Sequence, residues 1–243
     1  MGLLMLAGVL TFPAAAQTPA SADPDALYAA REHLPDARAA AAIWQQRLDR
    51  NPGDFEAAWK LARAGYFLGG RLPDKDARIE AFESGMAAAR AAIAARPDRP
   101  EGYFWLAATM GGLAELRGLG TGLRYRGAIR DNLERVLTMD PGFQKGSADR
   151  ALGRWYFKVP RLFGGSRRKA EAHLRASLAR DPDSIASRFF LAEVLEAEDR
   201  DEEAAQLLRE ILALPIDPEW APEDRDFKAR AQAMLAELQA GRR

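Results

Sequence analysis

Prolines recur along this chain at intervals that fit a repeated helical unit. The first four follow Asp, Asn or Arg and the fifth follows Leu214; they stand at Pro52, Pro97, Pro141, Pro182 and Pro215. The spacings are 45, 44, 41 and 33 residues. Proline has no backbone N–H and disfavours helix in the preceding residue, so each one indicates where a helix ends. The spacing therefore predicts stacked helical hairpins.

The residues between the prolines support this prediction. The first helix of each unit carries a pair that ends in a small residue, which would let its partner helix approach closely: Leu61-Ala62, Leu106-Ala107, Leu152-Gly153 and Leu191-Ala192. No segment alternates apolar and polar residues in the way that predicts a strand. We expect an all-α fold of five hairpins, the first degenerate (25–52), with a terminal helix at about 223–240 that caps the solenoid.

The shortest proline spacing lies within one residue of the 34-residue tetratricopeptide (TPR) unit. Over 25–240 the chain resembles TPR proteins, which implies a TPR-like solenoid with expanded repeats. Residues 152–182 (LGRWYFKVPRLFGGSRRKAEAHLRASLARDP) resemble the T component of TRAP-type solute transport systems. The segment LARAGYFL (61–68) resembles regulator-of-microtubule-dynamics-like TPR proteins. These resemblances imply binding of a protein partner or a role in solute uptake.

The N-terminus predicts export. Residues 2–12 form a short apolar run, and Ala14-Ala15-Ala16 follows Pro13 as a cleavage site would. We expect a signal peptide over 1–16 cleaved after Ala16, a disordered leader over 17–24, and a TPR-like domain over 25–243. The mature protein would then be periplasmic or secreted, with no transmembrane segment.

The sequence offers little catalytic chemistry. It has no cysteine, and its two histidines, His33 and His173, lie in different repeats. Ser166 fits a helix N-cap better than a nucleophile. The glycine-rich stretch 118–122 is interpreted as a flexible insertion between two helices, or as a loop that approaches a ligand. We expect no enzyme activity, no cofactor and no metal; a hydrolase remains a weak alternative.

Charge is concentrated in the middle of the chain. Residues 116–169 hold 13 Lys or Arg and four Asp or Glu, a balance of +9, whereas the whole chain is neutral. Nucleic acid is therefore not an expected partner. Arginine beside aromatic rings favours carboxylates and other planar anions. The candidate ligand- or partner-binding residues are Tyr103, Trp105, Arg124, Tyr125, Arg154, Trp155 and Arg161. Equally, aromatic residues in the first helix of a repeat can belong to the core.

Two functional hypotheses follow. The first is an exported scaffold or adaptor that binds a protein or peptide on the concave face of the solenoid. The second is a periplasmic accessory of a TRAP-type system that binds an organic anion or the solute-binding protein, with Arg124, Arg154 and Arg161 lining the site. An enclosed cleft with several arginines and aromatic rings would favour the accessory, and an open groove would favour the adaptor.

Overall fold

The computed structural model describes residues 23–241, which form helices and the turns between them. The first unit comprises α1 and α2, and four longer hairpins follow it. Helix α11 closes the series. The α-helices are α1 (Pro24–Ala29), α2 (Leu34–Arg50), α3 (Phe55–Arg71), α4 (Lys75–Ala95), α5 (Pro100–Arg117), α6 (Leu119–Met139), α7 (Phe143–Lys158), α8 (Arg167–Arg180), α9 (Ile185–Glu196), α10 (Asp201–Ala213) and α11 (Ala221–Ala240), with short 3-10 helices η1 (Arg161–Phe163) and η2 (Pro218–Trp220). The predicted all-α, TPR-like solenoid is confirmed.

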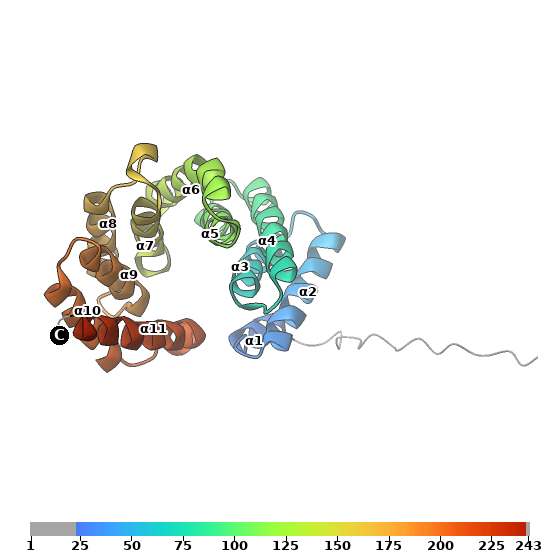
Figure 1. The fold of residues 1–243 in the computed structure, drawn as a ribbon. Coiled ribbons are helices and arrows are strands. Elements are labelled where there is room, and N and C mark those ends of the chain that lie inside the picture. The colour runs from blue at the N-terminus through green and yellow to red at the C-terminus, as the bar shows by residue number, and fades with distance from the viewer. Residues whose placement is uncertain (1–22, 242–243) are drawn as a thin grey trace, which may run out of the picture.

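The hairpins curve into a nearly closed ring (Figure 1). Helices α3, α5, α7 and α9 line its inner side, and α2, α4, α6, α8 and α10 lie outside them. Helix α11 completes the ring, because its N-terminal end lies beside α1. Consecutive helices form the main packing contacts, as expected of a solenoid in which each unit packs on its neighbours.

Small residues allow the helices of one unit to approach closely. A Cβ added at Gly153 in α7 would lie 2.6 Å from Cγ of Leu174 in α8. Between α3 and α4, a Cβ at Gly65 would lie 2.7 Å from Cα of Gly85. Ala62, Ala107 and Ala192 are also buried. The small-residue pairs therefore act as the sequence predicted.

Side-chain caps set several helix starts. Asp54, Asp74, Ser166 and Ser184 each accept a hydrogen bond from a backbone N–H of the first turn. Such a cap satisfies one of the N–H groups that a helix start leaves without a partner. The N-cap role predicted for Ser166 is confirmed by its bond from the Lys169 N–H.

The predicted flexible insertion at 118–122 is wrong. Only Gly118, with φ +89°, separates helix α5 from helix α6. Helix α6 begins at Leu119, so Gly120 and Gly122 lie inside it. The longer units are longer because their helices are longer: α4 and α6 have 21 residues each, whereas α10 has 13.

Element boundaries differ slightly from expectation. Helix α1 begins at Pro24, capped by Asp23, within the expected leader. Helix α11 begins at Ala221, two residues before the expected start. The predicted signal peptide lies outside the described residues. Within residues 23–241, no helix is both long and apolar enough to span a bilayer.

Candidate functional site on the inner face of the ring

A chain of ion pairs crosses the inner side of the ring. Arg154 of α7 contacts Glu115 of α5 at 3.3 Å and also Glu193 of α9, and Arg230 of α11 lies 3.8 Å from Glu193. Because these charges alternate from helix to helix, they tie α5, α7, α9 and α11 together. We call the inner face the surface formed by these residues and by Tyr66, Arg71, Arg150, Phe190, Asp226 and Phe227.

Aromatic rings pack beneath these arginines. The Arg154 guanidinium lies 4.6 Å from the ring centroid of Phe190, and that of Arg230 lies 5.1 Å from Phe227. The Phe190 and Phe227 rings meet edge to face, with centroids 5.3 Å apart. The rings stack with the guanidinium groups and limit their motion, so their N–H donors are held in place.

Arg150 is the exception among the inner-face arginines. It lies one helical turn before Arg154 on the same stripe of α7, yet no carboxylate in the described part of the chain forms an ion pair with it. Its Nη2 donates a hydrogen bond of 2.6 Å to Oγ of Ser147. Burial lowers the pKa of the Arg150 guanidinium. The half-buried guanidinium is therefore partly desolvated, and the Asp181 and Asp224 carboxylates act on it electrostatically without forming an ion pair.

Further donors lie near Arg150. Tyr66 of α3 is close enough to interact electrostatically with it, and 42% of Tyr66 is exposed. Desolvation of the hydroxyl raises the pKa of Tyr66, and the nearby Glu115 carboxylate raises it further. The Trp105 ring lies 5.8 Å from that of Tyr66, and its buried Nε1 has no hydrogen-bond partner among residues 23–241. Positive charge and free donors together suit an acceptor such as a carboxylate.

The start of α7 holds Arg150 through an unusual backbone turn. Gln144, Lys145 and Gly146 have φ values of 43°, 56° and 83°, in the left-handed region that non-glycine residues rarely adopt. The Ser147 hydroxyl, which binds Arg150, donates to the Gln144 carbonyl at 2.8 Å. Backbone strain of this kind is concentrated at functional sites, where the surrounding fold maintains it.

The two ends of the solenoid meet through side chains. Arg31, after α1, binds Glu223 of α11 at 2.7 Å and donates to the Glu219 carbonyl at 2.6 Å. Arg71 of α3 binds Asp226 of α11 at 2.7 Å. A third pair joins Arg225 to Glu32. These pairs define the seam, and they enclose the inner face.

The predicted binding residues divide among three places. Arg154 lies on the inner face, and Trp105 is buried in the core against Tyr66. Arg124 and Arg161 are exposed on the outside of the ring. The others are structural: Tyr103 donates to the Pro97 carbonyl, Tyr125 packs against the core, and Trp155 is buried with its Nε1 bonded to the Arg126 carbonyl.

Sequence reasoning missed Tyr66, Arg71, Arg150 and Arg230 as inner-face residues. Arg150 could have been found, because it precedes Arg154 by four residues and so shares its helix face. Arg71 and Arg230 gave no such signal, since their position depends on closure of the ring.

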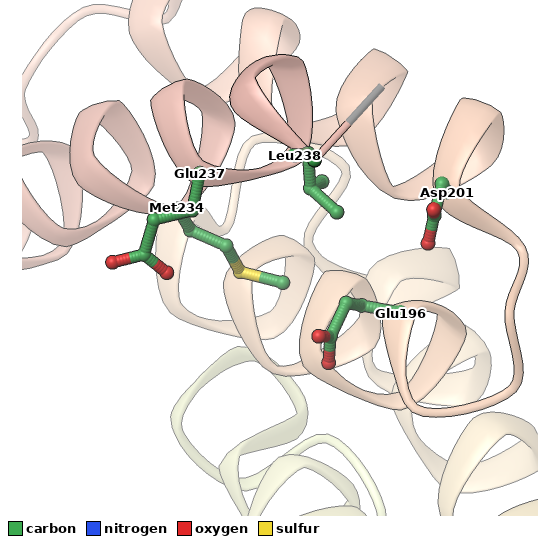
Figure 2. A pocket seen from close by; sticks show the side chains of 6 residues that line it. Glu196, Asp201, Met234, Glu237 and Leu238 are labelled. Carbon is green, nitrogen blue, oxygen red and sulfur yellow. The ribbon is translucent and has the colours of Figure 1, made fainter. Parts of the chain in front are cut away.

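A shallow pocket of about 190 Å³ lies away from the inner face, near the C-terminal end. Its lining includes Met234, Leu238 and three carboxylates. Figure 2 shows the Glu237 carboxylate pointing away from those of Glu196 and Asp201. Among the described residues, no group of three His, Asp or Glu side chains could hold a metal ion.

Comparison with solved structures supports the repeat class. A thermophilic TPR protein from Thermus thermophilus is 25% identical and superposes with a TM-score of 0.66, covering 88% of this chain and 97% of that one. The MamA protein is 16% identical, with a TM-score of 0.50 over 83% of this chain and 95% of its own, a likeness of fold alone. No curated protein sequence matched significantly.

The family comparison covers almost the whole ring. The model of the family "Regulator of microtubule dynamics protein 1-3" matches residues 22–239, from just before α1 into the last turn of α11. The segment LARAGYFL, which first suggested this relationship, forms part of the inner helix α3. The chain therefore belongs to the regulator of microtubule dynamics protein 1-3 family.

Proposed function

We propose that this protein is an exported, non-enzymatic scaffold whose inner face binds a carboxylate-bearing segment of a partner protein. The observation that carries the proposal is Arg150, a desolvated guanidinium without an ion-pair partner among the described residues. A bound carboxylate would neutralise it and accept a bidentate pair of hydrogen bonds. Tyr66 would add aromatic contact area and a hydroxyl donor.

The same site also fits a second candidate, a small organic anion. The ring is closed by the seam, and its inner face carries several arginines and aromatic rings. Arginines and aromatic rings gathered on the inner side of a closed ring support an accessory to solute uptake. The ligand would then be a small di- or tricarboxylate, or the partner would be a periplasmic solute-binding protein.

Arg150→Met tests both candidates. Peptides with free C-termini would be selected from a random library on the wild-type protein, and their affinities measured by fluorescence anisotropy. We expect the selected peptides to carry acidic or C-terminal carboxylates, and Arg150→Met to weaken binding at least about tenfold, as loss of a charge-assisted pair should. Arg90→Met, at an exposed arginine outside the inner face, is the control.

Stability provides a second readout. Because Arg150→Met removes a partly desolvated charge that has no ion-pair partner among the described residues, the variant should unfold at the same temperature as wild type or higher. A panel of small di- and tricarboxylates in the same thermal assay distinguishes the two candidates. If one of these compounds raises the unfolding temperature and the library yields no binding peptide, the small anion is favoured. Selected peptides that bind Arg150→Met as tightly as wild type would disprove the proposed site.

Export is tested separately, by locating the mature protein in fractionated cells and sequencing its N-terminus. We expect it outside the cytoplasm, beginning at Gln17. Recovery from the cytosol alone would contradict export and leave the proposal for the inner face intact.

A further inference from the structure

The outside of the ring carries a second unusual surface where α6, the end of α7 and the start of α8 meet. The turn between α7 and α8 contains η1, which projects from the ring in Figure 1. We call this the η1 surface. It comprises Leu119, Arg124, Arg126, Lys158, Arg161, Leu162, Phe163, Arg167, Arg168 and Lys169, all of them exposed.

Within residues 23–241, the seven cations of the η1 surface form no ion pairs. The acidic residues Glu83, Asp131, Glu134 and Glu171 form their ion pairs with arginines outside this surface, namely Arg117, Arg130, Arg175 and Arg200. Elsewhere on this protein, exposed arginines commonly pair, as Arg96 does with Asp98 and Arg99 with Glu101. The η1 surface therefore has a concentrated positive charge that the described fold leaves uncompensated.

Apolar side chains stand among these cations. Leu162 is 87% exposed, and Phe163 is 40% exposed. On α6, Leu119 is 63% exposed and lies two turns before Arg126, on the same face of the helix. The Phe163 ring lies 5.8 Å from the Arg126 guanidinium, which joins the α6 and η1 parts into one surface.

A rigid turn holds Leu162 in water. The N–H groups of Phe163 and Gly165 both donate to the Pro160 carbonyl, at 2.8 and 3.2 Å, and the Ser166 N–H donates to the Tyr156 carbonyl at 2.8 Å. A Cβ at Gly165 would lie 1.6 Å from the Val159 carbonyl oxygen, so the turn has no room for a side chain there. Leu162 thus remains exposed because the backbone fixes it at the tip.

We propose that the η1 surface docks on an anionic lipid bilayer, with Leu162, Phe163 and Leu119 entering the interface and the seven cations facing the lipid headgroups. Basic residues around exposed apolar side chains are the pattern of proteins that lie on membranes. A projecting apolar tip suits insertion between lipids.

Vesicle co-sedimentation of the full-length protein tests the proposal. Vesicles of phosphatidylcholine with about one third phosphatidylglycerol are compared with pure phosphatidylcholine. We expect binding only to the anionic vesicles, weakened by raising the salt concentration. Because all variants share one N-terminus, any contribution from the apolar run at residues 2–12 is common to them and cancels in the comparison.

Matched charge reversals locate the binding surface. Arg161→Glu, Arg167→Glu and Arg168→Glu together should reduce vesicle binding more than about a hundredfold, since each basic residue near an anionic surface contributes about fivefold. The control reverses three exposed arginines elsewhere, at Arg38, Arg90 and Arg209, which also lack ion pairs in the described structure. It changes net charge equally and should reduce binding far less.

The apolar tip is tested in the same way. Leu162→Gln should weaken binding several-fold, whereas Ile216→Gln, at an exposed apolar residue away from the cations, should not. Circular dichroism would check that all variants remain folded.

Equal losses in the two triple variants would overturn the proposal, as would absence of vesicle binding by wild type. An acidic protein bound in place of vesicles, and lost in the η1 variant, would also overturn it. None of these outcomes affects the test at Arg150.

Discussion

Single glycines decide how closely the helices of a unit can pack, and two of them should respond to substitution in opposite directions. Gly153 of α7 faces α8, where Leu174 is fully buried. Around Gly127 of α6, the described structure places no atom within 4 Å of the position where a Cβ would stand. Both lie inside helices, so alanine is the better helix former at each.

Gly153→Ala should destabilise the protein by about 1–3 kcal/mol, because the new Cβ would overlap Leu174 Cγ in a packed core. Gly127→Ala should stabilise it by about 0.5–1 kcal/mol, through helix propensity alone. Chemical denaturation would measure both free energies of unfolding. A stabilising Gly153→Ala would show that α7 and α8 can move apart at little cost.

At the scale of the element, the beginning of α7 departs most from regular structure. Gln144 has φ 43°, ψ 52°, and its buried Oε1 has no hydrogen-bond partner in the described part of the chain. Glycine adopts this backbone conformation without strain, and it would remove the unsatisfied oxygen. Both effects favour the folded state.

Gln144→Gly should therefore stabilise the protein by about 1 kcal/mol, after allowing for the greater freedom of glycine in the unfolded chain. Peptide affinity should stay unchanged, since glycine keeps the backbone carbonyl that orients Ser147 and, through it, Arg150. Thermal denaturation and peptide affinity are the two measurements. Lower stability, or a loss of affinity, would mean that the Gln144 side chain itself supports the turn.

The proline spacing predicted the order and number of helical units because proline and small residues act locally. The same reasoning failed at Gly120 and Gly122, which lie within helix α6 despite the low helix propensity of glycine. It also grouped binding residues that lie in separate parts of the structure. Tyr103 and Trp155 are aromatic and lie near arginines, as predicted. The Tyr103 hydroxyl, however, donates to the Pro97 carbonyl, and the Trp155 Nε1 donates to the Arg126 carbonyl. Which arginines face inward depends on the curvature of the ring, which no single unit encodes.

At the scale of the whole molecule, the seam closes the ring. The ends meet through ion pairs of Arg31, Arg71 and Arg225, and a hollow of about 580 Å³ lies between them, lined by residues such as Ala30, Pro218 and Arg225. Long side chains can part with little repacking of the core, so the seam is where the ring should open to admit a ligand.

Arg31→Met with Arg71→Met should open the seam. The natural chain has no cysteine, so spin labels at Ala30→Cys and Ala229→Cys, both at exposed positions on opposite sides of the seam, would report its width by electron–electron double resonance. The loss of Arg31, which is buried, leaves Glu223 without its ion-pair partner. The two ends of the ring then lose their main attraction. We expect a narrow distance distribution in the otherwise unchanged protein and a longer, broader one in the double variant.

Arg90→Met with Arg209→Met is the matched control and should keep the narrow distribution. If ligand entry requires opening, the open variant should also bind selected peptides with a faster association rate. An unchanged distance would mean that helix packing around the ring, and not the seam, holds the two ends together.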